Sequence, residues 1–364
     1  MTIFIILFIY LLLLKVLFGG KNSKNARISL CVLAGFGLWV VLALRSPYCG
    51  VDLVSGFAGS ANYLNQFLRV TYYSLTQIAE GSLSDFTSSE TGWLLYSKLV
   101  SLVTRDFQVF LAITAFIQIG LIGFVFYKYS SDIILSYIVY FCFGLYIMSF
   151  SGLRQSTAVA IAFFSFHFLI NNKKWLFALA VLLAASLHTS ALLFFIVYPL
   201  RKIQLSTTKS IIAIFAIFVA LPLLSFIIGT VVPFLFGNRY QHYEDTGGAI
   251  TLFLLYVAIS LFSLKIKLNT QRDSLYRSLI IVAVACQSLG YISAGAMTRI
   301  GFYFSIFFSL LFPELVKVYS AKDSRQILFT LVSLLFFAFF YLTNIGGYLN
   351  VVPYYFFWEL VLIY

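Results

Sequence analysis

The sequence predicts an all-α polytopic membrane protein with about 11–13 transmembrane or half-membrane helices. Of its 364 residues, 62% are hydrophobic and 10% are charged. This composition is typical of integral membrane proteins and excludes a large soluble enzyme. Apolar runs long enough to cross about 30 Å of hydrocarbon recur from end to end, and the alternating strands of a lipid-facing barrel do not occur. We therefore expect residues 1–364 to form a single integral membrane domain.

The positions of the basic residues predict the orientation of the first two helices. The run Ile3–Phe18 lacks a basic start and a small-residue cleavage site, so we expect a helix that is retained and not a signal peptide. No Lys or Arg precedes it, whereas four occur at or just after its end: Lys15, Lys21, Lys24 and Arg27. The positive-inside rule then places the amino terminus outside and this loop in the cytoplasm. Ile28–Leu44 returns outward.

Residues 45–92 are predicted to form a long periplasmic loop after the second helix. Within it, Tyr63–Ile78 has apolar and aromatic residues at helical spacing, which predicts an interfacial helix along the membrane surface. The next apolar run, Trp93–Val103, is too short to span the membrane. We expect it to be interfacial or re-entrant.

Three membrane crossings follow, and they lead into a central motif block at residues 149–202. They are Phe107–Tyr127, Ile133–Phe150 and Gln155–Ile170. The next apolar interval, Trp175–Leu200, has basic residues at both ends. If both ends are cytoplasmic, the interval must be two short helices that meet at His188 on the outer side. The alternative is one tilted crossing.

The second half of the chain is predicted to contain five further helices and an aromatic tail. The first four of these helices are Ile211–Phe236, Ile250–Leu264, Leu279–Ser293 and an inward helix that starts at Arg299 and ends at Glu314. An outer loop, residues 237–249, lies between the first two of them. One more helix runs from about Arg325 to Asn344. The tail Asn350–Tyr364 is either an aromatic interfacial segment or a further partial span.

Arginine residues near the outer helix ends are the main candidates for substrate binding. Seven of the 24 Lys and Arg residues fall outside the predicted cytoplasmic loops, and six of these seven are Arg. Four lie at outer helix ends in separate parts of the chain: Arg45, Arg154, Arg239 and Arg299. A guanidinium grips phosphate or carboxylate through two parallel hydrogen bonds, so a converging set suits a diphosphate-linked lipid. The alternative for any one Arg is contact with lipid headgroups.

Other polar residues could complete a catalytic site. Asp52 and Glu90 could each act as a general base, or Asp52 could pair with an Arg and Glu90 could cap the following helix. His188 could be a base, a phosphate donor or a buried histidine bonded to a carbonyl group. Gln155 follows Arg154 at the same helix start, and Tyr240 and Tyr303 could stack on sugar rings.

Several function classes lack their motifs in this sequence. The net charge of +12 is scattered over short loops, which is typical of a membrane protein and gives no reason to expect nucleic acid as a partner. No G-x-x-x-x-G-K-[ST], H-E-x-x-H or Cys/His metal-binding spacing occurs. The four Cys form no disulfide framework. We therefore expect neither a metal nor a cofactor.

Six short motifs lie in or beside the predicted outer segments. They are R-S-P-Y-C-G-V-D (Arg45–Asp52), E-x-G (Glu90, Gly92), G-L-R-Q (Gly152–Gln155), L-H-T-S-A-L (Leu187–Leu192), N-R-Y (Asn238–Tyr240) and T-R-I-G-F-Y-F (Thr298–Phe304). Taken together, these motifs resemble the EpsG-like branch of the Wzy-type O-antigen and exopolysaccharide polymerases, over most of the chain. The R-Q block followed by H-x-S is the most specific part. One departure is G-V-D at residues 50–52, where such proteins often have G-T-D.

The resemblance implies a membrane glycosyltransferase of the bacterial inner (cytoplasmic) membrane, with its active site facing the periplasm. Such an enzyme transfers a growing glycan from undecaprenyl diphosphate onto a new lipid-linked repeat unit. The implied partners are undecaprenyl-diphosphate-linked glycans, membrane lipids and a chain-length regulator. We expect Arg154, Arg239 and Arg299 to bind diphosphate, and Arg45 to support the loop or the acceptor. The alternatives are a lipid-linked oligosaccharide flippase or other transporter, and an O-antigen-type ligase.

Overall fold

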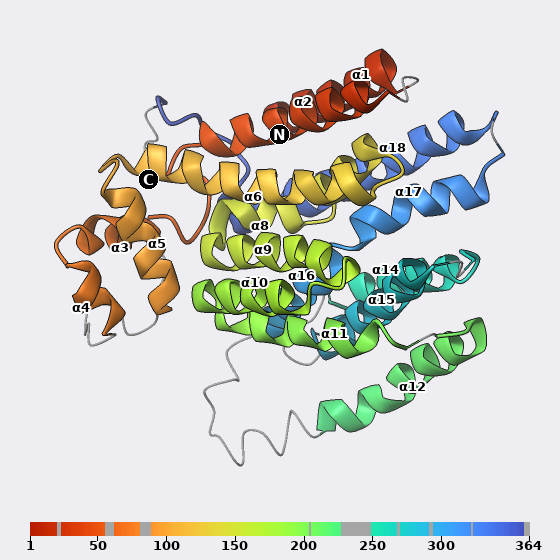
Figure 1. Cartoon of the computed structure of the whole chain (residues 1–364). Helices are drawn as coiled ribbons and strands as arrows, with labels where there is room; N and C mark the ends of the chain where they lie inside the picture. Colours follow the sequence, from red (N-terminus) through yellow and green to blue (C-terminus); the bar gives the residue numbers. More distant parts are fainter. Residues whose placement is uncertain are drawn as a thin grey trace. The chain divides into compact units, whose positions relative to one another are not determined.

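The computed structural model describes nine stretches of the chain, and they fall into two units (Figure 1). The first unit comprises Met1–Leu192 and Gln326–Tyr364, and the second comprises Leu193–Arg325. Across the described stretches the only β-type pairing is one isolated bridge, between Arg45 and Phe356, so the predicted all-α class is confirmed. The described residues are 1–19, 23–54, 62–80, 89–203, 205–226, 249–267, 270–290, 294–321 and 323–359.

The described helices supply enough apolar segments for a polytopic membrane protein. Four helices are long and apolar enough to cross a membrane: α2 (Lys24–Ala43), α6 (Phe107–Tyr129), α9 (Leu153–Ile170) and α18 (Arg325–Asn344). Two bent pairs also qualify: α7 (Ile133–Cys142) with α8 (Leu145–Ser151), and Arg299–Ser305 of α16 (Ala294–Ser305) with α17 (Phe308–Tyr319). Five shorter apolar helices also occur among the described residues: Thr2–Phe18, Lys174–Leu187, Thr189–Leu200, Thr207–Ala220 and Thr251–Ser263. The described residues therefore contain eleven apolar segments when each bent pair counts as one, in line with the predicted 11–13 transmembrane or half-membrane helices.

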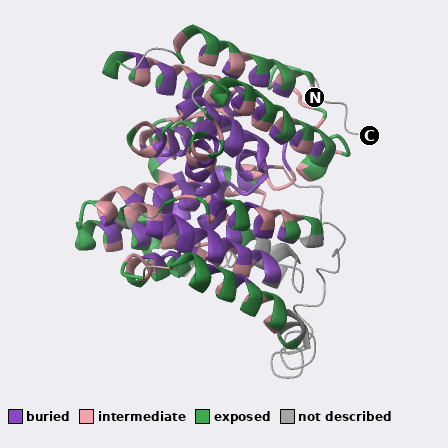
Figure 2. Ribbon diagram, turned by 90° about the vertical axis from the view of Figure 1, so that its right-hand side faces the viewer, coloured by how far each residue is buried: buried purple, intermediate pink, exposed green. Residues whose placement is uncertain are grey.

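The bent pair α7–α8 forms the centre of the first unit. Every residue of both helices is buried, and exposed residues lie on the outward faces of the surrounding helices (Figure 2). The sequence predicted one continuous crossing over Ile133–Phe150. Instead the helix bends by 54° at Gly144, whose φ of +85° is a left-handed conformation that favours glycine. Because both helices are buried all round, no amphipathic pattern marks the break.

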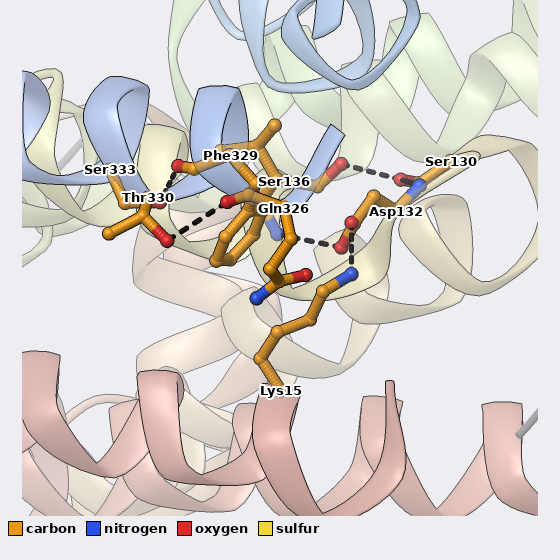
Figure 3. A network of polar contacts seen from close by, with 9 residues as sticks. Lys15, Ser130, Asp132, Ser136, Gln326, Phe329, Thr330 and Ser333 are labelled. Carbon is orange, nitrogen blue, oxygen red and sulfur yellow. Dashed lines mark hydrogen bonds and ion pairs between the residues drawn. The ribbon is translucent and has the colours of Figure 1, made fainter. Parts of the chain in front are cut away.

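An ion pair joins α1 (Thr2–Phe18) to the start of α7 (Figure 3). Lys15 Nζ contacts Asp132 Oδ2, and the other carboxylate oxygen of Asp132 accepts the backbone N–H of Leu135 at 3.2 Å. The Lys15 ammonium also lies 4.8 Å from the centre of the Phe329 ring on α18. One lysine therefore connects three helices at the end that the charge pattern assigns to the cytoplasm.

The predicted interfacial helix over Tyr63–Ile78 is two short helices. They are α3 (Tyr63–Val70) and α4 (Leu75–Ala79), and Ser74 and Gln77 form a capping box that begins the second. The following helix, α5 (Thr91–Ser101), is as short as expected. That this region lies along the membrane surface stays a prediction.

The interval Trp175–Leu200 is interrupted at His188, as the charge pattern predicted. Helix α10 (Lys174–Leu187) ends there, and His188 has an extended backbone with φ −156° and ψ 112°. A 3₁₀ helix, η2 (Thr189–Ile196), and the short α11 (Val197–Leu200) follow. The interval is therefore two helical segments and not one. The return of the second segment to the cytoplasmic side stays a prediction.

A buried arginine organises the second unit. Arg277 on α15 (Gln271–Gly290) is 4% exposed and donates hydrogen bonds to the carbonyl oxygens of Leu205, Leu264 and Ile266. These hydrogen bonds connect α15 to the segment just before α12, which contains Leu205, and to the segment just after α14, which contains Leu264 and Ile266. The sequence predicted this helix only from Leu279, because its first two turns are polar. The remaining helices here are α12 (Thr207–Phe226) and α14 (Ala249–Ser263).

The described part of the tail packs on the first unit. The Tyr354 hydroxyl donates to the carbonyl oxygen of Val41 at 2.9 Å, and the backbone N–H of Phe357 donates to Leu44 O at 3.0 Å. Of the two predictions for the tail, a partial helical span is not seen as far as Glu359. These contacts place the tail against the loop that carries Arg45.

Candidate functional site

A carboxylate shared by two basic side chains forms the candidate site in the first unit. Glu90 Oε2 accepts from Arg154 Nη1 at 2.6 Å, and Glu90 Oε1 lies 2.8 Å from His188 Nδ1. The backbone N–H of Thr189 also donates to Glu90 Oε1, at 3.3 Å. The side chain of Arg154 is 15% exposed, that of Glu90 is 19% exposed and that of His188 is 28% exposed, so the cluster is half-buried. It joins residues 90, 154 and 188 in one place.

Each of the three residues lies at a helix end, which explains how distant segments meet. Glu90 is the N-cap residue of α5, Arg154 lies in the first turn of α9, and His188 follows the last residue of α10. The ends of α5 and α10 approach closely because Gly92 packs directly on the backbone of Ser186. A Cβ atom at position 92 would lie 2.6 Å from the Ser186 carbonyl carbon. This close approach is a structural reason for the glycine of the E-x-G motif.

Replacing Gly92 with alanine should separate Glu90 from His188. The added methyl group collides with backbone, which yields less readily than the end of a flexible side chain, and such overpacking costs about 1–3 kcal/mol of stability. We expect a lower thermal unfolding temperature in detergent and a reduced rate of the reaction at this site. Gly346→Ala is the matched control, because no atom lies within 4 Å of a Cβ at that position. Equal behaviour of the two variants would contradict the close approach.

Tyr63 belongs to the cluster, although no sequence motif marks it. Its hydroxyl oxygen accepts from Arg154 Nε at 3.4 Å and from the Arg154 backbone N–H at 3.5 Å. Its ring lies 5.9 Å from the guanidinium and packs edge-on against Trp93. Burial raises the pKa of Tyr63 although the charge of Arg154 opposes the rise, so the phenol stays neutral. The only sequence signal was its place at the start of the amphipathic run.

Arg45 supports the loop that carries Asp52. It is 1% exposed and donates to Leu42 O at 2.8 Å and to Ser149 O at 3.1 Å. Its guanidinium also lies 5.0 Å from the Phe150 ring centre. A side chain buried in this way is not positioned to grip an incoming phosphate. The placement favours the loop-supporting role over the substrate-binding one.

The loop from Arg45 to Asp52 is fastened to the segment that starts α9. Gly50 has φ +131° and packs on the carbonyl group of Phe150, where a Cβ would collide. The next residue, Val51, donates its backbone N–H to Ser151 Oγ at 3.1 Å, and Asp52 O accepts the Tyr63 N–H at 3.0 Å. The first motif therefore meets the G-L-R-Q motif in the structure. Asp52 is half-buried, and it lies close enough to Tyr63 for its charge to help raise the pKa of that phenol.

The other predicted site residues belong to α9, to the second unit or to stretches outside the described residues. Gln155 follows Arg154 on α9 and is 5% exposed. Arg299 is exposed and Tyr303 is 1% exposed, and both belong to α16 of the second unit. Arg299 lies inside that helix and not at its start, because the helix begins at Ala294. Arg239 and Tyr240 lie outside the described residues.

The two basic neighbours keep Glu90 ionised. Burial alone would raise the pKa of the Glu90 carboxyl group, but the hydrogen bond from His188 and the charge of Arg154 outweigh burial and lower it to about 2. Glu90 lies before α5, outside the membrane-spanning helices. An ionised carboxylate can only accept hydrogen bonds, so His188 Nδ1 must carry the proton in their contact. Glu90 is then too weak a base for proton abstraction near neutral pH.

The low pKa of Glu90 predicts a pH dependence of stability. A carboxyl group whose folded pKa lies below its unfolded value stabilises the protein fully above the unfolded value. That contribution is lost as the pH falls from about 4.5 towards about 2. We expect Glu90→Gln to be less stable than the unaltered protein at neutral pH, and the difference to shrink as thermal unfolding is followed down to about pH 3. A difference that does not change with pH would contradict the ion pairing.

The arrangement can support acid–base chemistry at His188. Glu90 holds the Nδ1 proton, so the neutral imidazole has its lone pair on Nε2, and no described residue donates a hydrogen bond to that atom. A carboxylate that orients an imidazole in this way also stabilises the imidazolium form after proton uptake. Among the described residues, no three His, Cys, Asp or Glu side chains gather as a metal site would require. The polar groups that this cluster presents are the His188 imidazole, the Arg154 guanidinium and the Tyr63 hydroxyl group.

Comparison with known proteins identifies the family. The family model described as the EpsG family matches residues 30–356, which is most of the chain. No curated protein and no solved structure gives a significant match. The matched range contains Glu90, Arg154 and His188 together with the loop from Arg45 to Asp52. The chain therefore belongs to the EpsG family, a family of Wzy-like polymerases.

Proposed function

We propose that this protein polymerises a polysaccharide of the exopolysaccharide or O-antigen type at the periplasmic face of the bacterial inner membrane. The growing glycan is transferred from undecaprenyl diphosphate onto a new undecaprenyl-diphosphate-linked repeat unit. Family membership supports the polymerase class. The observation that supports an enzymatic site most strongly is the carboxylate of Glu90 held between Arg154 and His188.

His188 is the proposed general base for the acceptor. Its Nε2 takes the proton from a sugar hydroxyl group of the new repeat unit, and the hydroxyl oxygen attacks the anomeric carbon of the donor glycan. The bond between that carbon and the diphosphate oxygen breaks, and undecaprenyl diphosphate leaves. Glu90 is a positioning residue, because it acts on the imidazole and not on the substrate. The proton on His188 then passes to solvent or to the departing diphosphate.

Arg154 is the proposed group that stabilises the diphosphate. It lies in the first turn of α9, where the partial positive charge of the helix end adds to its own charge. Tyr63 and Glu90 hold the guanidinium from two sides, so little reorganisation is needed when negative charge develops on the leaving group. Arg239 and Arg299 are proposed to bind diphosphate as well, and Asp52 is the second candidate for the base.

A reaction with purified components tests the proposed function. The unaltered protein in proteoliposomes receives a synthetic polyprenyl-diphosphate-linked repeat unit, and the products are separated by size. A ladder of lengthening glycans is the expected result. Movement of the lipid-linked unit across the bilayer without extension would indicate a flippase and contradict the proposal. Transfer only onto a different acceptor would indicate a ligase and contradict it equally.

The base is identified in the same assay by comparing two variants. Asp52→Asn removes the half-buried carboxylate beside the cluster, and His188→Gln removes the imidazole while a side-chain donor is kept near Glu90. If His188 is the base, His188→Gln should lose extension and Asp52→Asn should retain most of it. The reverse pattern would assign the base to Asp52.

A further inference from the structure

An apolar groove runs along the outer faces of α2 and α6 in the first unit. Its volume is about 420 Å³, and its rim includes Phe36 and Phe116, which are 54% and 65% exposed. The groove extends along α2 from Ile28 to Trp39, which corresponds to about 16 Å at 1.5 Å per residue. This length is about half of the 30 Å hydrocarbon thickness. Both helices pass the criteria for a membrane span, so the groove has the depth of one leaflet.

Three glycines and a buried tyrosine shape the floor of the groove. The Tyr137 hydroxyl group, from α7, lies between the two helices and would be 2.9 Å and 2.5 Å from Cβ atoms at Gly35 and Gly123. It donates to Cys31 O at 3.2 Å, so the polar atom at the floor is satisfied. A Cβ at Gly120, by contrast, would meet no atom within 4 Å. The groove is therefore open at Gly120 and has an apolar surface along its length.

Basic residues stand at the end of the groove that is lined by Ile28 and Tyr127. The exposed Lys128 places its ammonium group 5.9 Å from the Phe124 ring and 5.5 Å from the Tyr127 ring, and both rings line the groove. Lys24 is exposed at the start of α2, one turn before Ile28. Arg27 donates to the carbonyl oxygens of Tyr127 and Ser130, and the nearby carboxylate of Asp132 pairs with Lys15. The net charge at this end is positive.

We propose that this groove binds one acyl chain of an anionic phospholipid, whose phosphate group lies against Lys24 and Lys128. The groove supplies an apolar channel of leaflet depth, and the two ammonium groups supply charge at the headgroup level. The charge pattern assigns this end to the cytoplasmic leaflet. The site is distinct from the Glu90 cluster, and it takes a structural lipid and not the glycan carrier.

Trp39 reports on the groove directly because it lines the outer end. The indole Nε1–H donates to Ala112 O at 2.9 Å, which fixes the ring. Trp175 and Trp358 are exposed and would also be quenched by lipid, so both are replaced by Phe in the test protein. Trp93 is 1% exposed and is therefore kept. This variant is reconstituted in phosphatidylcholine vesicles that contain a small fraction of phospholipid brominated on its acyl chains. Quenching of Trp39 fluorescence is compared for brominated phosphatidylglycerol and brominated phosphatidylcholine at equal fractions.

The proposal predicts about fivefold more effective quenching by the anionic lipid for each lysine that contacts its phosphate. Lys24→Gln with Lys128→Gln should abolish the preference. Lys265→Gln with Lys267→Gln removes two exposed lysines of the second unit and should leave the preference unchanged. Gly120→Leu fills the groove and should reduce quenching by the anionic lipid. Ala338→Leu adds the same side chain on an exposed face of α18, and it should leave quenching by the anionic lipid unchanged.

Two results would overturn the proposal. Equal quenching by both brominated lipids would show a groove without headgroup selectivity. Absence of quenching by either lipid would show that protein, such as a second copy of the chain, covers the groove. Neither readout depends on glycan extension, so the outcome is independent of the proposed polymerase activity.

Discussion

Replacing His188 with alanine should reduce the rate of glycan extension by about 10²- to 10⁴-fold, the usual contribution of a general base. The variant should remain folded, because Glu90 keeps its ion pair with Arg154. Extension is measured as the initial rate of repeat-unit incorporation by purified protein, and folding is followed by thermal unfolding in detergent. His188→Gln keeps a side-chain N–H donor near Glu90, so it should be more stable than His188→Ala but should extend glycans equally slowly.

His167 provides the matched control for this prediction. It is also a half-exposed histidine at a helix end, and its Nδ1 lies 2.8 Å from the Tyr129 hydroxyl oxygen, away from the Glu90 cluster. His167→Ala should therefore extend glycans at close to the unaltered rate. If His188→Ala retained that rate as well, His188 would be a structural histidine.

Replacing Arg154 with lysine should lower the extension rate by about 10²-fold although the charge is conserved. The guanidinium donates to Glu90 through Nη1 and to the Tyr63 hydroxyl oxygen through Nε at the same time. An ammonium group is a single flexible point charge and cannot hold this fixed geometry. We expect the thermal stability to change much less than the rate, because charge pairing with Glu90 persists.

Arg105→Lys is the control for the arginine prediction. Arg105 is exposed near the start of α6 and makes no ion pair with another described residue, so the same substitution there should have no effect. Full polymer length and rate in Arg154→Lys would argue against a role for this guanidinium in binding the diphosphate.

Charge placement predicted more of the fold than hydropathy alone. Basic residues at both ends of Trp175–Leu200 indicated a helix break, and the structure places the break at His188. The bend at Gly144 was not foreseen, because both α7 and α8 are buried on all sides and their composition is uniformly apolar. A glycine in an apolar run is equally compatible with a straight helix.

Long-range contacts limited the prediction of the site. Glu90, Arg154 and His188 were identified as candidates because charged residues are costly in an apolar chain, but their pairing depends on helix ends that meet only in three dimensions. Tyr63 was missed because an aromatic residue at an interface is ordinary, and its contact with Arg154 spans 91 positions. Arg45 was expected to support the loop or the acceptor, and sequence does not reveal its burial; in the structure it donates hydrogen bonds to backbone carbonyl groups, which fits the loop-supporting role.

A double-mutant cycle on the extension rate tests most directly whether Glu90 and His188 act as one unit. Rates are measured for the unaltered protein, Glu90→Gln, His188→Gln and the double variant. Because Glu90 acts through the imidazole, its loss should matter little once the imidazole is gone, and the double variant should be about as slow as His188→Gln alone. Fold-losses that multiply in the double variant would mean that the two residues act independently, and would contradict the shared site described above.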